Sequence, residues 1–167
     1  SWSGLKCTVE IDKKKSDGFD VMKDLYSISD KYGILRSRTI VDSVGVGSFI
    51  SGFMKGIVEF RSDHSSFSGR YSRLKDECAF KLADLIKRRE IKIVCNSIQR
   101  EEISKELSVL CIDNLQVDTQ KKKIISKEEM IRRLGHSPDY LDMLIMRMYF
   151  EIKNKGITSY IYSKKCN

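Results

Sequence analysis

The segment RTIVDSVGVGSFISGFMKGIVEF, residues 38 to 60, predicts a strand, a glycine turn, a helix and a second strand in immediate succession. RTIVD (38–42) and GIVEF (56–60) are short β-branched or apolar runs with the length of strands. Gly45 and Gly47 allow the chain to turn tightly between the first strand and the helix. Strands that alternate with helices in this way indicate an α/β sheet covered by helices.

The rest of the chain continues this alternation. Apolar and polar residues alternate from Leu5 to Asp12, which predicts a strand with one wet face, and IKIVC (91–95) predicts another. Helices are expected at 20–32, 71–89, 97–109 and 138–153, with a short one after the capping-box pattern at Ser126, and a hairpin at 112–117 and 123–126. Asp20 is expected to cap the first helix and Gly33 to end it, and Pro138 suits the first turn of the last helix. We expect a single domain.

The charge balance favours a polyanionic partner. The 167 residues include 31 Lys and Arg against 23 Asp and Glu, which gives a net charge of +8 and a pI of about 9.2. Basic residues gather at 61–89, at 121–123 and in the basic C-terminal tail, 154–167, and they predict salt-sensitive contacts with nucleic acid phosphates. No apolar run approaches the length that crosses a bilayer, so we expect a soluble, cytoplasmic protein with no membrane partner. Five widely spaced cysteines and two histidines argue against a structural zinc site.

Asp42 ends the first strand of the 38–60 segment, which is where open α/β sheets place their ligands. The glycines that follow would bring the backbone close to a phosphate or a metal ion. On this segment alone, a helix-capping role for Asp42 has more weight than a ligand role. Because G-V-G lacks both the third glycine of the dinucleotide motif and the G-K-[ST] of the P-loop, nucleotide binding is disfavoured.

A second candidate site lies in HSPDYLDML, residues 136 to 144. Ser137 or Asp139 could cap the helix that begins here, and an acid in the first turn suits the helix dipole. Asp142 lies on nearly the same helix face but adjoins the apolar stripe, so we expect it to be partly buried and to need a cation. That cation is either a divalent metal or one of the arginines. The candidate arginines are Arg132, Arg133 and Arg147. His136 could assist a metal or orient a water, although a polar loop residue is more usual at such a position.

Taken together, these motifs resemble the nuclease domain of the large subunit of tailed-phage terminases, which package viral DNA. The matching segments are IVDSVGVG (40–47), FISGFMKGIVEF (49–60), YSRLKDECAFKLADLIKRREIKI (71–93) and LGHSPDYLDMLIM (134–146). The two acidic motifs at their separation are the more specific part of this resemblance.

The resemblance implies a ribonuclease-H-like fold, a central mixed β-sheet flanked by α-helices. It further implies an endonuclease that cleaves concatemeric double-stranded DNA with two Mg²⁺ or Mn²⁺ ions, one activating a water and the other stabilising the leaving oxygen. Asp42, Asp139 and Asp142 would be the metal ligands, with His136 beside them in the catalytic site. The implied partners are an upstream ATPase motor domain of the same polypeptide, the terminase small subunit and the portal protein, in the host cytoplasm during phage assembly.

One departure from the family pattern concerns its first acid, which normally lies on a central strand ahead of a hairpin. Here Trp2-Ser-Gly resembles the first half of that hairpin and Leu5 to Asp12 the second, so the acidic strand is expected upstream of Ser1. Asp12 is a candidate substitute, although its place before a lysine run favours a turn. Two alternatives therefore remain: a non-catalytic nucleic-acid-binding module of the same fold with an incomplete metal site, and an interaction domain whose basic faces bind an acidic protein.

Overall fold

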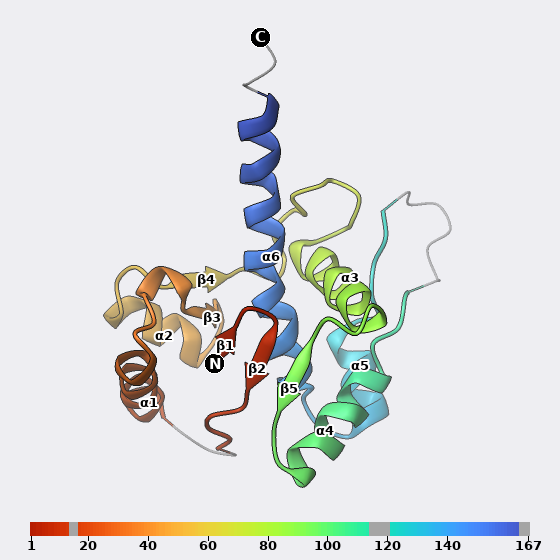
Figure 1. Ribbon diagram of the computed structural model, residues 1–167. Coiled ribbons are helices and arrows are strands. Elements are labelled where there is room, and N and C mark those ends of the chain that lie inside the picture. Colours follow the sequence, from red (N-terminus) through yellow and green to blue (C-terminus); the bar gives the residue numbers. More distant parts are fainter. Residues whose placement is uncertain (14–16, 114–120, 164–167) are drawn as a thin grey trace.

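The computed structural model describes residues 1–13, 17–113 and 121–163, with side chains as far as residue 153, as a mixed α/β fold with about 52% helix (Figure 1). Its strands are β1 (Trp2–Ser3), β2 (Lys6–Thr8), β3 (Ile40–Asp42), β4 (Val58–Phe60) and β5 (Lys92–Val94). Its helices are α1 (Gly18–Tyr32), the 3-10 helix η1 (Arg36–Arg38), α2 (Val46–Phe53), α3 (Leu74–Lys87), α4 (Ser97–Ser108), α5 (Lys127–Leu134) and α6 (Asp139–Ser163). The α/β class predicted from the sequence is confirmed.

The strands of the described residues form two small sheets. In the first, of order β1-β2-β5, β1 pairs antiparallel with β2 through Trp2 and Cys7, and β2 pairs parallel with β5 through Cys7 and Ile93. The hairpin expected from Trp2-Ser-Gly is therefore confirmed. The second sheet is the parallel pair of β3 and β4, in which Asp42 lies opposite Phe60.

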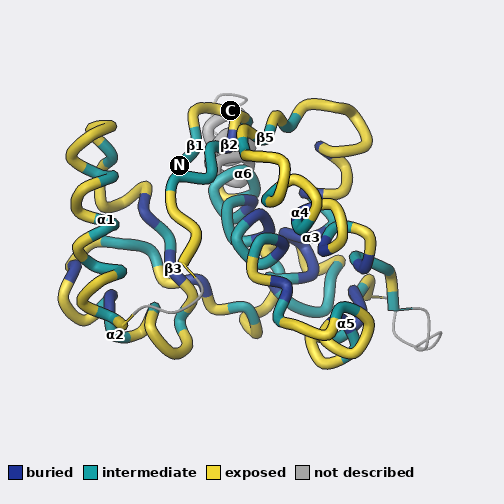
Figure 2. The backbone as a smooth tube through the Cα atoms, turned by 90° about the horizontal axis from the view of Figure 1, so that it is seen from below, coloured by how far each residue is buried: buried dark blue, intermediate teal, exposed yellow. Residues whose placement is uncertain are grey.

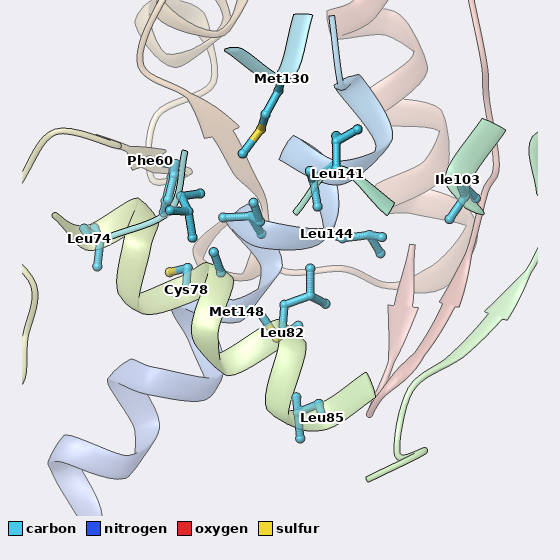
Figure 3. Close-up of a cluster of buried hydrophobic side chains, with 14 of the residues drawn as sticks. Phe60, Leu74, Cys78, Leu82, Leu85, Ile103, Met130, Leu141, Leu144 and Met148 are labelled. Carbon is cyan, nitrogen blue, oxygen red and sulfur yellow. The ribbon is translucent and has the colours of Figure 1, made fainter. Parts of the chain in front are cut away.

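Helix α6 lies at the centre of the molecule, and its first half packs in the main core together with α3 (Figure 1). Leu141, Leu144, Ile145 and Met148 are completely buried on it, at the spacing of a single helix face. Figure 3 shows Leu82 of α3 pointing into the same cluster as Leu144 and Met148. The start of α6 is thus held rigidly by the main core.

Helix α3 presents the apolar stripe that its sequence predicts, with one exception. Leu74, Cys78, Leu82 and Leu85 are buried against the core. The helical spacing of the sequence places Ile86 on this buried stripe as well, but Ile86 is 38% exposed, so that prediction is wrong. Ile86 follows Leu85 by about 100° around the helix, which turns it away from α6.

A second, smaller cluster joins β3 to α2 and α1. Its buried members are Val41, Ile50 and Met54, with Val21 and Leu25 of α1 among the partly buried residues packed on it. No residue of α1 is buried, and Figure 2 shows α1 and α2 mostly in the colours of exposed and intermediate residues. The α1–α2 unit therefore rests on a thin core.

The helix ends follow local capping rules, and one expected cap is wrong. The side chain of Asp17 accepts a hydrogen bond from the Asp20 backbone N–H, so Asp17 and not Asp20 caps α1. An N-cap side chain reaches the N–H three residues ahead, which places the helix start two residues earlier than its apolar pattern indicates. Gly33 ends α1 in the left-handed conformation, as predicted. Ser126 caps α5 as predicted, by accepting from the Glu129 N–H.

The hairpin predicted after α4 lies partly outside the described residues, which omit 114–120. Within the described part, Ile112 and Ile124 form an isolated antiparallel bridge, and Lys122 forms a parallel bridge with Tyr71. The backbone of 122–125 thus runs between Cys111 and the start of α3.

Among the described residues, no helix combines the length and the apolar character needed to span a membrane.

Candidate carboxylate site

Asp42 is positioned by the alternation of β3. Val41 packs in the small cluster with α2, whereas Ile40 packs against the main core around α6. Because successive side chains of a strand point to opposite faces, Asp42 shares the face of Ile40, on the side of α6. The Asp42 residue is exposed and ends its strand at the carboxyl edge of the parallel pair, the position predicted for a ligand-binding acid.

The glycine turn after β3 brings α2 unusually close to Asp42. The N-cap of α2 is Gly45, at φ 62° and ψ −130°, and α2 has no side-chain cap. The alternative interpretation, in which Asp42 caps this helix, is therefore wrong. A Cβ atom at Gly47 would lie 1.9 Å from the Asp42 carbonyl oxygen, so only glycine fits there. The turn thus fixes the end of β3 directly against the start of α2.

Asp142 holds two lysine side chains, one on each carboxylate oxygen. Lys75 of α3 donates to Oδ1 at 2.6 Å, and Lys127 of α5 donates to Oδ2 at 2.8 Å. The Asp142 side chain is 18% exposed, that of Lys75 13% and that of Lys127 42%. The prediction that Asp142 is partly buried and cation-paired is confirmed.

The arginines proposed as partners of Asp142 pair elsewhere. Arg132 and Arg133 both bind Glu129 on their own helix, and Arg147 binds Glu151. These three are i,i+3 or i,i+4 neighbours of their acids, so local pairing holds them on α5 and α6. Their assignment to Asp142 was therefore wrong, and the cations come from α3 and from the first residue of α5.

Asp139 is exposed at the first position of α6, but the first turn of that helix is capped from another helix. The buried Glu106 of α4 accepts a hydrogen bond from the Leu141 N–H at 2.8 Å. Burial raises the pKa of Glu106, although the Leu141 hydrogen bond and the charge of His136 act in the opposite direction. The capping expected from Ser137 or Asp139 is thus supplied by Glu106.

Lys127 pairs with Asp142 and also responds to the charges of the other two predicted acids. Burial by itself lowers the pKa of Lys127, but the hydrogen bond to Asp142 and the charges of Asp142, Asp139 and Asp42 outweigh it and raise that pKa. Asp42 and Asp139 therefore lie close enough to the Lys127 ammonium group to stabilise its charge. The charges of Asp142 and of Asp42, nearly one hundred residues apart in the sequence, thus both act on Lys127.

His136 and Asp12 have neighbours of their own. Nδ1 of His136 lies 2.8 Å from the Ser137 carbonyl oxygen, and its Nε2 lies 3.7 Å from Glu102 of α4. Asp12 accepts a hydrogen bond from the Tyr140 hydroxyl. Burial, followed by this contact with Asp12, raises the pKa of Tyr140. His136 therefore faces α4, and Asp12 connects the segment after β2 to α6.

The metal ions implied by the resemblance can be tested against these side chains. Carboxylates are the ligands that Mg²⁺ and Mn²⁺ prefer, so the donor chemistry is suitable. However, within the three described ranges no group of three or more His, Cys, Asp and Glu side chains could hold a metal ion. Both oxygens of Asp142 already accept from ammonium groups. As arranged here, the carboxylates do not fit a metal cluster.

Three residues of this site were not anticipated from the sequence: Lys75, Lys127 and Glu106. Lys127 follows a predicted N-cap, Ser126, and Lys75 lies in the first turn of a basic, amphipathic helix, so each has the character of a solvated surface residue. Their spacing to Asp142 in the chain is irregular. The one indication of the two lysines in the sequence was the prediction that Asp142 needs a cation. It did not identify which residues supply that cation.

Comparison with protein-family models, with curated proteins and with solved structures found no match for this chain.

Proposed function

We propose that this chain is a metal-dependent DNA endonuclease domain of a viral DNA-packaging terminase, with a ribonuclease-H-like fold, that hydrolyses concatemeric double-stranded DNA. The observation that supports the proposal is that Lys127 pairs with Asp142 and that the charges of Asp139 and Asp42 also act on its ammonium group. The two acidic motifs that carry the resemblance are far apart in the sequence and have no local reason to meet. A shared carboxylate site would require the two motifs to lie near one another, and acids of both motifs act on the same lysine.

The surroundings of the carboxylates suit a DNA backbone. Asp42 and Asp139 are exposed, and so is the Lys127 side chain beside them, so a phosphodiester could reach all three. Lys127 would contact a phosphate by charge alone, without reading the DNA sequence. The hydrolysis that the resemblance implies depends on divalent ions. The carboxylates must therefore rearrange before they could hold such an ion.

The basic surface is smaller than the charge count implies, because ion pairs neutralise part of it. Arg73 binds the buried Asp76 through two hydrogen bonds, and Arg88 binds both Asp84 and Glu90. Asp76 in turn ties α3 to the neighbouring backbone, because it accepts from the Ile124 N–H. Arg73 and Arg88 thus have structural roles, and DNA contacts would fall to the remaining lysines and arginines.

A second candidate function is a non-catalytic DNA-binding module. The observation that favours it is that Asp142 is neutralised by two lysines within the protein. A carboxylate that satisfies both of its oxygens in this way can serve the fold alone. Such a module would bind DNA through its basic surface and leave the phosphodiester intact.

Nicking of supercoiled plasmid in Mn²⁺ separates the two functions. We expect the wild-type chain to nick, Asp42→Ala to abolish nicking, and Asp84→Ala to leave it unchanged, because Asp84 is an exposed acid of α3 paired with Arg88. Binding with a steep salt dependence but no nicking would favour the module. If the chain neither binds nor cuts DNA at low salt, both functions are wrong.

A further inference from the structure

We propose that the outer face of α1 and α2 binds a single strand of DNA, whose unpaired bases stack on exposed phenylalanine rings. We call this surface the aromatic patch, and it consists of Phe19, Tyr26, Phe49 and Phe53. Both views place α1 and α2 together at one edge of the molecule, away from α3 and α5 (Figure 1, Figure 2). The choice of DNA as the partner rests on the proposed function, whereas the aromatic patch does not involve the carboxylates.

The three phenylalanine rings of the aromatic patch contact one another but remain open to water. The centre of the Phe49 ring lies 5.2 Å from that of Phe19 and 4.7 Å from that of Phe53. The rings of Phe19 and Phe53 are 6.2 Å apart. Phe49 packs on the small cluster around α2, but Phe19 is 62% exposed and Phe53 57% exposed. Grouped apolar side chains that stay this exposed mark a binding surface.

Cationic side chains border the aromatic patch. Lys23 lies one turn after Phe19 and one turn before Tyr26, so it shares their face of α1. The Arg36 guanidinium group lies 5.8 Å from the centre of the Tyr26 ring and donates to the Lys55 carbonyl oxygen at 3.3 Å. Lys55 itself follows the C-cap of α2, and all three cations are exposed. Rings and cations thus alternate around one surface.

The acids of α1 lie mainly on other faces of the helix. Asp17 is its N-cap, and Asp24 pairs with Lys13. Asp20 follows Phe19 by about 100° around the helix. Asp30, one turn beyond Tyr26, is an acid on the same face as the rings.

The charge of the aromatic patch favours a polyanion. Among the described residues, no acid pairs with Lys23, Arg36 or Lys55, and the three cations outnumber Asp30. Two copies of the chain that met through this face would bring like charges together, which opposes self-association. A partner with negative charges and flat apolar groups is complementary to it, and single-stranded DNA has both.

The exposed rings favour unpaired bases over a duplex. In double-stranded DNA each base is covered by its stacked neighbours, whereas an unpaired base can lie flat on an aromatic side chain. Every base has such a face, so this contact tolerates any sequence. Phe19 and Phe53 would supply the stacking surfaces, and Lys23, Arg36 and Lys55 the contacts with phosphates.

The test is the affinity of the folded chain for a fluorescein-labelled oligothymidylate of about 16 nucleotides and for a duplex of the same length, measured by fluorescence anisotropy in EDTA. We expect Phe53→Ala to weaken single-strand binding at least about fivefold, the loss of one stacked base, and to leave duplex binding unchanged. Phe53→Tyr keeps the ring and should retain the wild-type affinity. Lys23→Gln should reduce the slope of log affinity against log salt by about 0.7, whereas Phe53→Ala should leave that slope unchanged.

The matched control is Phe67→Ala. Phe67 is 56% exposed, almost as much as Phe53, but its ring packs on Tyr149 of α6, outside the aromatic patch. We therefore expect Phe67→Ala to bind the oligothymidylate like wild type. Thermal melts establish that each variant is folded. Phe53→Leu keeps an apolar side chain without a flat ring, so it should lose single-strand binding even if the alanine variant does not fold.

Several results would overturn the inference. They are a wild-type chain that does not bind the oligothymidylate at low salt, wild-type affinity in both Phe19→Ala and Phe53→Leu, and an equal loss in Phe67→Ala. A wild-type dimer in sedimentation velocity that Phe53→Ala dissociates would assign the aromatic patch to a second copy of the chain. Cosedimentation with anionic phospholipid vesicles, without oligothymidylate binding, would assign it to a lipid surface.

Failure of the proposed function looks different. If Phe53→Leu loses single-strand binding and the wild-type chain does not nick plasmid in Mn²⁺, the aromatic patch binds DNA and the nuclease function is wrong. If the wild-type chain nicks plasmid and Phe53→Leu binds the oligothymidylate as tightly as wild type, the inference alone is wrong.

Discussion

Lys75 of α3 donates a hydrogen bond of 2.6 Å to Asp142 of α6, and the two residues are 67 positions apart in the chain. Both side chains are mostly shielded from water, at 13% and 18% exposure. The pair therefore joins the first turns of the two helices that build the main core. The second pair of Asp142, with Lys127, is much more open to solvent.

Replacing either lysine by methionine separates these two pairs. Lys75→Met leaves a shielded carboxylate with one partner fewer, and we expect it to lower the free energy of unfolding by about 1–3 kcal/mol. Lys127→Met removes an exposed ion pair and should cost no more than about 1 kcal/mol. Urea unfolding followed by circular dichroism measures both values. Equal losses would show that the two lysines support the fold alike.

Glu106 should stabilise the start of α6. Glu106→Ala removes the acceptor for the Leu141 N–H, so we expect the free energy of unfolding to fall by about 1–2 kcal/mol. Glu106→Gln keeps a carbonyl oxygen and removes a buried charge, so it should be more stable than the alanine variant. Glu101→Ala on the exposed face of α4 is the control and should change little. A Gln variant as unstable as the Ala variant would contradict the capping role.

Two glycines of α2 should respond in opposite ways to alanine. A Cβ at Gly47 would meet the Asp42 carbonyl oxygen, so Gly47→Ala should destabilise the protein by more than about 1 kcal/mol. Gly52 has no atom within 4 Å of an added Cβ, and Gly52→Ala should stabilise α2 by about 0.5–1 kcal/mol. Thermal melts of the two variants compare them directly. The same sign for both would contradict the close packing of α2 on β3.

Glu129 gives a pH-dependent contribution to stability. Its hydrogen bonds with Arg132 and Arg133 lower the pKa of Glu129 to about 2, below its unfolded value near 4.5. A lowered carboxyl pKa stabilises the folded state above the unfolded pKa, and this contribution is lost as the pH falls through the folded pKa. The melting temperature of wild type should therefore exceed that of Glu129→Gln above about pH 4.5. The difference should shrink toward pH 2 and in high salt, whereas a constant difference would contradict the ion pairs.

Local signals allowed much of the fold to be predicted. The order of strands and helices follows from apolar periodicity, and Gly33 and Ser126 mark helix ends through backbone and capping chemistry that acts within a few residues. The division of the strands into two small sheets could not be predicted, because it depends on which strands pair across the chain. The exposure of Ile86 was missed because the buried face of α3 is narrower than the set of apolar residues at helical spacing in its sequence.

Of the candidate site, the sequence allowed only the acidic residues to be predicted, and not the lysines that pair with them. Asp42 and Asp142 stand out because each lies beside an apolar run, at a strand end or a helix start. Lys127 does not, because a lysine at the first position of a helix is ordinary. The pairing of Asp142 with Lys75 and Lys127 results from how α3 and α5 dock against α6, which no local pattern encodes.

Val41 and Asp42 are consecutive residues of β3, yet they lie on opposite faces of the strand. Val41 packs in the small cluster with α2, and Asp42 lies on the side of α6. Among the described residues, the cluster that holds Val41 has two other buried members, Ile50 and Met54, whereas α6 is anchored by a much larger core. Regions with few buried contacts open at a lower free energy than the whole protein. Amide hydrogen exchange should thus be faster in α1 and α2 than in α3 and α6. Each such opening releases the strand that carries Asp42 while Asp139 and Asp142 stay in place, so the full set of carboxylates is only as persistent as the weaker half of the fold.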